Sequence, residues 1–136
     1  MGGARVLVGT VIGTVIGTVV GILCAIAPPS QAGADALPAQ VGQCSQTAIS
    51  RVGTRLEGAA DSGSAVWFAN KGGQVSYEAV PAITRSRTGD PVKMCLVSIP
   101  QDCPPGDSRG RIYQTTNLRT HESWRLPDSQ HSCGGA

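Results

Sequence analysis

The chain has 136 residues, with 11 Lys and Arg against 9 Asp and Glu, which gives a formal net charge of +2. This length suits one small domain, and the near balance of charges is unlike a nucleic-acid-binding protein, so we expect no nucleic-acid partner. The aromatic side chains are two Trp, two Tyr and one Phe. A core with so few large side chains buries little apolar area and usually needs covalent cross-links.

The amino-terminal segment has the order of an export signal. Arg5 precedes an uncharged apolar run over residues 6–26, and Ala32-Gly33-Ala34 follows a Pro-Pro break. A basic start, an apolar stretch and a small-residue cleavage site define a signal peptide. The sequence therefore predicts a signal peptide over residues 1–34 and a periplasmic or secreted protein.

The alternative is that this segment is kept as an anchor in the inner membrane. Glycines recur every four residues in the apolar run, at Gly9, Gly13, Gly17 and Gly21. Such spacing lines one helix face with small residues and lets a second helix approach closely. The run over residues 6–26 is also close to the ~20 residues needed to span a bilayer. It is the only membrane contact we expect.

Four cysteines follow the leader: Cys44, Cys95, Cys103 and Cys133. An exported chain meets oxidising conditions, so we predict two disulfides. Four cysteines allow three pairings, among which spacing alone does not decide. We favour Cys44–Cys133, which would join the two ends of the domain, together with Cys95–Cys103, which would join a strand end to the following turn.

The first part of the exported chain combines a linker and short strands. Residues 35–43 are small, polar and Pro-containing and read as a linker before a domain over residues 44–136. Residues 47–56 are ambiguous, because their apolar spacing suits a short helix and their Thr and Val content suits a strand. Residues 64–69 and 74–80 flank a Gly-rich turn and predict a β-hairpin.

The second part continues the same pattern. Residues 81–91 read as an exposed connection, and the apolar run over 92–99 predicts a central strand. Residues 100–110 are too rich in Pro and Gly for regular structure. Residues 111–116 and 122–126 predict a second hairpin. We therefore expect an all-β fold: a small antiparallel sandwich or barrel of five to six strands, stapled by disulfides and preceded by a signal helix.

Three arginines near the second hairpin are candidates for contact with an anion or a partner. Arg109 and Arg111 would alternate toward one face with Tyr113, and Arg125 would lie on the polar face of the paired strand. A guanidinium group binds carboxylates and phosphates through two parallel hydrogen bonds. The alternative is an ordinary solvated sheet face whose arginines are neutralised by nearby acids.

The histidines suggest two further kinds of site, neither of which we favour. His121 and His131, with Asp128 and Cys133, are residue types that bind metal, but Cys133 is better explained as half of a disulfide and no zinc-ligand spacing occurs. We expect no metal, no cofactor and no enzymatic activity, with a small hydrolase using His121 or His131 and an acid as the alternative.

Two resemblances to known proteins are visible. Residues 89–100, the Cys-Pro-Pro-Gly-Asp turn at 103–107 and the final Cys-Gly-Gly-Ala resemble a group of small exported bacterial proteins of unknown function, which implies export and no particular activity. Ser62-Gly63-Ser64 followed by Lys71-Gly72 is similar to two loops of periplasmic inhibitors of c-type lysozyme. That similarity implies that Ser62 and Lys71 would reach the catalytic acids of a lysozyme.

Taken together, these patterns favour an exported, non-catalytic module that binds a protein or an envelope component through its loops and one sheet face. The alternative is a structural or stress-related envelope protein without a discrete ligand.

Overall fold

A computed structural model describes residues 9, 13 and 35–135 of the chain. The predicted signal peptide or anchor, residues 1–34, lies outside the described residues except for two isolated glycines. None of the helices in the described ranges is long and apolar enough to cross a bilayer.

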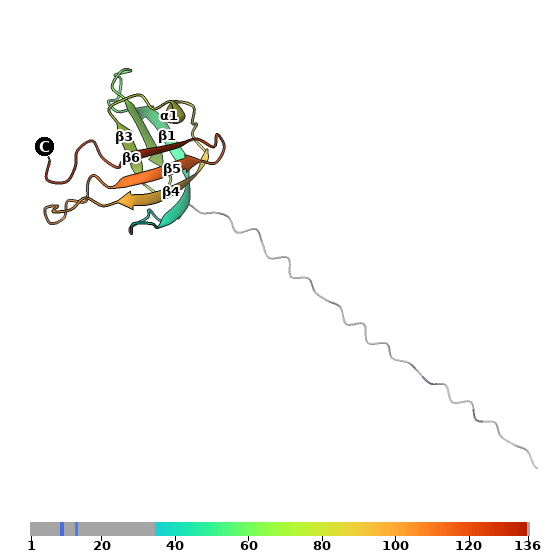
Figure 1. The fold of residues 1–136 in the computed structure, drawn as a ribbon. Helices are drawn as coiled ribbons and strands as arrows, with labels where there is room; N and C mark the ends of the chain where they lie inside the picture. Colours follow the sequence, from blue (N-terminus) through green and yellow to red (C-terminus); the bar gives the residue numbers. More distant parts are fainter. Residues whose placement is uncertain (1–8, 10–12, 14–34, 136) are drawn as a thin grey trace, which may run out of the picture. The chain divides into compact units, whose positions relative to one another are not determined.

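The domain contains six strands and one short helix, in the chain order β1 (Cys44–Thr54), β2 (Ser64–Phe68), β3 (Gly73–Ser76), α1 (Pro81–Thr84), β4 (Pro91–Ser98), β5 (Ile112–Asn117) and β6 (Ser123–Pro127). All neighbouring strands are antiparallel and form one sheet in the order β3-β2-β1-β4-β5-β6. The sheet curls into a half-barrel (Figure 1). The all-β, antiparallel prediction is confirmed.

The long strand β1 joins the two halves of the curl. Its first half pairs with β4, and its second half pairs with β2. The register shifts between Ile49 and Arg51, where β1 changes partner, and again between Leu96 and Ser98 in β4. Such irregularities bend a strand and increase its twist, which allows the sheet to curl. The segment that the sequence left ambiguous, residues 47–56, thus belongs largely to a strand.

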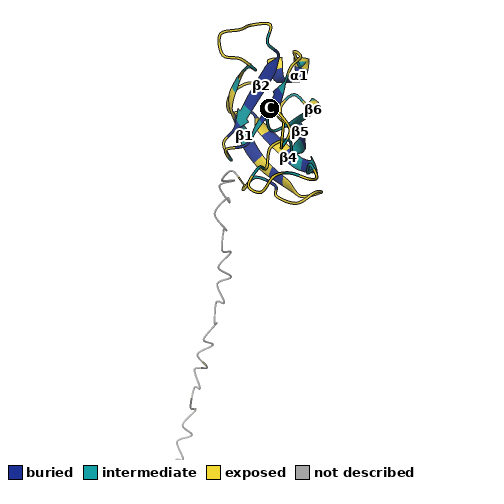
Figure 2. Cartoon of the chain, turned by 90° about the vertical axis from the view of Figure 1, so that its left-hand side faces the viewer, coloured by how far each residue is buried: buried dark blue, intermediate teal, exposed yellow. Residues whose placement is uncertain are grey.

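The core lies on the concave side of the sheet, and Figure 2 shows that buried residues are concentrated in the strands. Its largest fully buried side chains include Tyr113, Ile49, Met94 and Leu96. Helix α1 contacts β1, β2 and β6 and adds Ala82 and Ile83 to the core. The prediction that residues 81–91 form an exposed connection is therefore wrong in part, because Ala82, Ile83, Ser86 and Asp90 are buried while the other residues of the segment are exposed. A short apolar pair after a proline was enough to form one helical turn over the core.

The side chain of Gln74 bridges the two edge strands of the half-barrel. Its Nε2 donates hydrogen bonds to the carbonyl oxygens of Tyr113 (2.7 Å) and Leu126 (3.0 Å). Its Oε1 accepts hydrogen bonds from Thr115 Oγ1 (2.6 Å) and Trp124 Nε1 (2.8 Å). One buried amide thus makes four hydrogen bonds and connects β3 to β5 and β6.

Two disulfides cross-link the domain, but their pairing differs from the predicted one. The bonds are Cys44–Cys95 and Cys103–Cys133, not Cys44–Cys133 and Cys95–Cys103. The reason lies in the strand order. Antiparallel pairing of β1 with β4 puts Cys44 directly opposite Cys95, with their Cα atoms 4.0 Å apart. Disulfides of this kind indicate an oxidising environment.

Residues 35–43, predicted as a linker, lie against the sheet. Pro38 is fully buried, and its carbonyl oxygen accepts a hydrogen bond from Tyr113 Oη at 3.2 Å. The Asp35 amide donates to the Gln46 carbonyl at 2.9 Å. The Gly42 amide donates to the Leu96 carbonyl at 2.8 Å. Together these contacts order the segment on β1, β4 and β5.

We predict that Gln74→Met lowers the free energy of unfolding by about 3 kcal/mol. Methionine has a similar volume but cannot pair with the buried groups of Thr115 and Trp124, and each buried polar group left unpaired costs about 1–3 kcal/mol. Chemical denaturation of the oxidised protein measures the change. The matched control is Gln114→Met, on the convex side of β5, which should cost less than about 0.5 kcal/mol. Equal effects at the two positions would contradict the role of Gln74.

Candidate functional site

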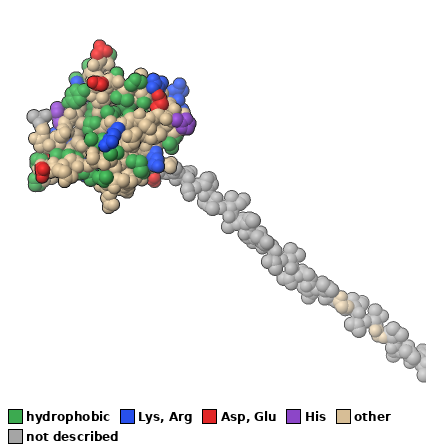
Figure 3. Space-filling model, in the orientation of Figure 1, with side chains coloured by type: hydrophobic (Ala, Val, Ile, Leu, Met, Phe, Trp, Pro, Cys, Tyr) green, Lys and Arg blue, Asp and Glu red, His purple; other side chains and the backbone are tan. Residues whose placement is uncertain are grey.

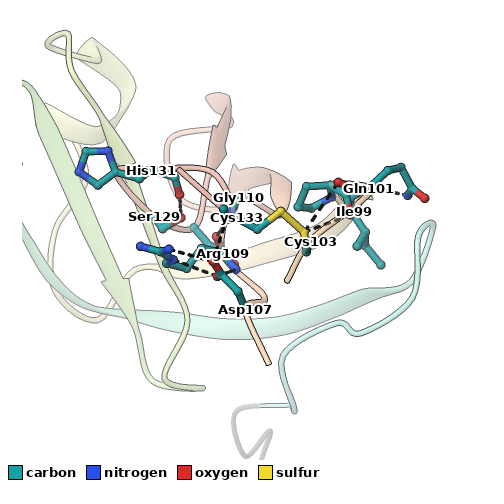
Figure 4. The surroundings of a disulfide bond; sticks show 12 residues. Ile99, Gln101, Cys103, Asp107, Arg109, Gly110, Ser129, His131 and Cys133 are labelled. Atoms are coloured by element: carbon teal, nitrogen blue, oxygen red, sulfur yellow. Dashed lines mark hydrogen bonds and ion pairs between the residues drawn. A yellow bond between two sulfur atoms is a disulfide. The ribbon is translucent and has the colours of Figure 1, made fainter. Parts of the chain in front are cut away.

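Arg109, the first of the three predicted contact arginines, makes an internal ion pair. Its Nε and Nη2 donate to the two carboxylate oxygens of Asp107 at 2.9 and 2.8 Å. Asp107 also accepts the Gly134 amide at 3.0 Å. Its pKa is lowered, chiefly by the Arg109 hydrogen bonds. Figure 4 shows this pair beside the Cys103–Cys133 disulfide, where it helps to hold the carboxyl-terminal tail.

Arg111 and Arg125 do not share one face of the sheet with each other. Arg125 lies opposite Gln114 in the β5–β6 ladder, whereas Tyr113 lies opposite Leu126. Neighbouring strand positions project to opposite faces, so Arg125 projects away from the buried Tyr113. Arg111 precedes β5, and its Nε is buried with no hydrogen-bond partner among the described residues. On the face drawn in Figure 3, basic side chains form separate spots and no continuous patch.

The histidines and the cysteine of the tail are not brought together as metal ligands. Cys133 is bonded to Cys103, and Figure 4 shows His131 directed away from that disulfide. His121 precedes β6 and His131 follows it, so the whole strand separates the two side chains. The part of the chain that the structure describes holds no group of three or more His, Cys, Asp or Glu side chains suited to a metal ion.

Ser62 and Lys71 lie at opposite ends of β2, one before the strand and one after it. The Ser62 hydroxyl is used within its own loop, where it accepts the Leu56 amide at 2.9 Å and donates to the Ala59 carbonyl at 2.7 Å. The two side chains therefore do not form a joint contact surface of the kind that the similarity to lysozyme inhibitors implies.

The structure assembles a different cluster on the convex side of β1, β2 and β3. Arg51 lies opposite Trp67 in the β1–β2 ladder, and Trp67 lies opposite Gly73 in the β2–β3 ladder. Arg55 directly follows β1, and Tyr77 directly follows β3. We call the surface formed by Arg51, Gly53, Arg55, Trp67, Gly73 and Tyr77 the Trp67 face.

Each arginine of the Trp67 face stacks on an aromatic ring. The Arg51 guanidinium carbon lies 3.6 Å from the centre of the Trp67 ring, and that of Arg55 lies 4.3 Å from the centre of the Tyr77 ring. Cation–π contacts at exposed sites contribute about 0.5–1 kcal/mol each. A guanidinium group stacked on a ring can still donate hydrogen bonds through its N–H groups.

Two glycines adjoin the Trp67 ring. A Cβ atom at Gly53 would lie 3.5 Å from the ring, and one at Gly73 would lie 3.4 Å from it, both at ordinary contact distance. The indole therefore extends across the outer surface from beside Gly73 in β3 to beside Gly53 in β1. This arrangement leaves Trp67 half-buried rather than hidden in the core.

Two hollows lie on either side of Trp67 and Arg55. The first, of about 350 Å³, lies above Gly53 between Arg51 and Arg55 and is bounded by residues 57–58; we call it the Gly53 hollow. The second, of about 220 Å³, lies over β2 and β3 and is bounded by the tail residues 128–130. The tail is held there by Tyr77 Oη, which donates to the Gln130 carbonyl at 3.0 Å, and by Arg55 Nη1, which donates to Gln130 Oε1 at 3.0 Å.

Sequence reasoning missed the Trp67 face, although a signal for it was present. Arg51-Val-Gly-Thr-Arg55 places two arginines four residues apart with a glycine midway. On a strand this pattern puts both arginines on one face with a gap between them. Because the composition of this segment fits both a helix and a strand, the pattern alone does not show that the two arginines share a face. Nothing in the sequence shows that Trp67 and Tyr77 lie beside them.

A second charged cluster, around Asp90, makes hydrogen bonds within the fold. Asp90 is buried, and its carboxylate accepts hydrogen bonds from Arg119 (2.5 and 2.8 Å), Asn117 Nδ2 (2.9 Å) and the Arg87 amide (2.9 Å). Asn117 also donates to Ser86 Oγ at 2.8 Å. The pKa of Asp90 is lowered below its ordinary value, chiefly by its hydrogen bonds with the Arg119 side chain. The cluster ties the segment after α1 to the β5–β6 turn.

No protein-family model, curated protein or solved structure matches this chain. The assignment of a function therefore depends on the chemistry of the Trp67 face.

We predict that the stabilising effect of Asp90 disappears in acid. Because its pKa in the folded state lies below the ordinary value of 3.8, its contribution is complete above that value and is lost as the pH falls below it. The gap in unfolding free energy between the wild type and Asp90→Asn should therefore be large at pH 7 and shrink toward pH 2. Asp61→Asn, on an exposed loop, should differ from the wild type by less than about 0.5 kcal/mol at pH 7. A gap for Asp90→Asn that does not change with pH would refute the prediction.

Proposed function

We propose that this protein is an exported, non-catalytic module that binds a protein or another envelope component through the Trp67 face. The observation that carries the proposal is a pair of arginines, the exposed Arg51 and the half-buried Arg55, each stacked on an aromatic ring beside a hollow. Trp, Tyr and Arg are the residue types that contribute most to binding energy in protein interfaces.

The exposure of a large aromatic side chain at this face supports the same proposal. Tyr77 is 56% exposed. Exposed apolar groups next to arginines are typical of interaction surfaces, in which aromatic and Arg side chains are enriched and Lys and Glu are depleted.

The face is also ordered before a ligand arrives. Arg55 Nε donates to the Ser62 carbonyl at 2.7 Å, in addition to its contacts with Tyr77 and Gln130. A side chain held in this way loses little conformational entropy on binding, so more of its interaction energy contributes to affinity. An enzyme would instead need a nucleophile or a general acid and base set across a cleft, and the proposal requires neither.

We predict that a photo-crosslinking aromatic residue placed at Tyr77 forms an adduct with a discrete partner in intact cells of the native host. The same residue placed at Arg125, on the convex side of β6, should form no such adduct. Immunoblotting followed by mass spectrometry of the adduct identifies the partner. Adducts only at Arg125 would favour a contact site at the predicted arginines, and no adduct at either position would support a structural protein without a discrete ligand.

We further predict that protein recovered from the native envelope has lost residues 1–34. Its intact mass should match residues 35–136, and four cysteines should react with an alkylating reagent only after reduction. A mass that includes the leader would instead support the membrane anchor over residues 6–26. Thiols that react without reduction would contradict export into an oxidising compartment.

A further inference from the structure

The Gly53 hollow has a shape and charge that identify the ligand of the Trp67 face more closely. It is lined by residues 51–55, Glu57, Gly58 and Trp67. Positions 51, 53 and 55 lie on the same side of an extended chain. The hollow of about 350 Å³ therefore borders both arginines and has room for a side chain of a ligand.

Both guanidinium groups retain donor capacity toward a ligand. The only ion pair of Arg51 within the described ranges is with Glu57 at 3.5 Å, and the side chains of these two residues are 55% and 93% exposed. Exposed pairs of this kind contribute about 0–1 kcal/mol, so a ligand carboxylate can replace Glu57 at little cost. Arg55 uses its Nε and Nη1 internally, which leaves Nη2 available.

The spacing of the arginines matches that of an extended polypeptide. Four residues of strand, at about 3.3 Å each, separate Arg51 and Arg55 by about 13 Å along β1. Two acidic residues at positions i and i+4 of an extended peptide have the same separation and project to the same side. The side chain at i+2 would then enter the Gly53 hollow beside the Trp67 ring.

We propose that the Gly53 hollow binds an extended acidic segment of a protein, with carboxylates at i and i+4 on Arg51 and Arg55 and the i+2 side chain above Gly53. This inference rests on the proposed function, because it assigns a ligand class to the same face. The exposed ring of Tyr77, which stacks on Arg55 of the hollow, favours a polypeptide, since it offers an apolar contact to a neighbouring side chain of the ligand.

The test is a titration of the oxidised protein with the peptide acetyl-Ser-Glu-Ser-Leu-Ser-Glu-Ser-amide, followed by the NMR signals of the arginine side chains and the Trp67 indole. The same composition with the glutamates at i and i+3 should bind at least fivefold more weakly, because its carboxylates point to opposite sides of an extended chain. The version with Gln in place of both Glu should show no saturable shift.

Variants of the protein test the geometry. Arg51→Gln and Gly53→Val should each weaken binding at least tenfold, the first by removing a donor and the second by filling the floor of the hollow. Valine is compatible with a strand, and a Cβ at this position meets Trp67 only at ordinary contact distance. Glu57→Gln should strengthen binding two- to fivefold by removing the competing carboxylate. Arg125→Gln is the matched control and should change nothing.

The inference would be overturned if the i, i+4 and i, i+3 peptides bound equally well. It would also be overturned if Gly53→Val bound the peptide as tightly as the wild type, or if Arg125→Gln weakened binding as much as Arg51→Gln. Stronger binding of inorganic phosphate or of polygalacturonate than of the peptide would also overturn it, in favour of a phosphate or an acidic polysaccharide. If the peptide fails to bind while the Tyr77 adduct still forms in cells, the ligand class is wrong and the binding function of the face stands.

Discussion

The buried amide of Gln74 takes the place of a backbone ladder between the first and last strands of the sheet order. β3 and β6 are the two edges of an open sheet, and they approach each other without pairing. The amide donates to two carbonyl groups and accepts from Thr115 and Trp124, so its full hydrogen-bonding capacity is used. An apolar residue here would leave several buried groups unpaired at about 1–3 kcal/mol each. The curl of the half-barrel therefore depends on a polar side chain, Gln74, that is buried beside a largely apolar core.

The same constraint positions the surface on the other side of β3. Gln74 is held inward, so the neighbouring Gly73 lies on the convex side, where it adjoins the Trp67 ring. Tyr77 directly follows β3. Its ring stacks on Arg55, and its hydroxyl group donates a hydrogen bond to the Gln130 carbonyl of the tail. The β3 part of the Trp67 face thus lies on the outer side of the strand whose inner side carries the buried amide of Gln74. A ligand binding there would meet an already ordered surface, which lowers the entropic cost of association.

Disulfides and ion pairs stabilise both the sheet and the loops outside it. Cys44–Cys95 joins the two central strands, while Cys103–Cys133 and the Asp107–Arg109 pair hold the long loop to the tail. The cluster around Asp90 does the same for the segment after α1. Such contacts suit a domain with few large aromatic side chains, in which the apolar core alone contributes limited stability.

Local patterns in the sequence determined most of the strands, the turns and the use of Cys44, Cys95, Cys103 and Cys133 in disulfides. Alternation, Gly-rich reversals and redox context are properties of neighbouring residues and of composition. Strand order is not such a property. Only the tertiary structure placed β1 between β2 and β4, and that placement set Cys44 opposite Cys95 rather than beside Cys133. It also set Arg51 opposite Trp67 and separated Arg125 from the face of Tyr113. Contacts between residues distant in the chain depend on how the sheet curls. The register shifts in β1 and β4 and the hydrogen bonds of the buried Gln74 amide contribute to that curl.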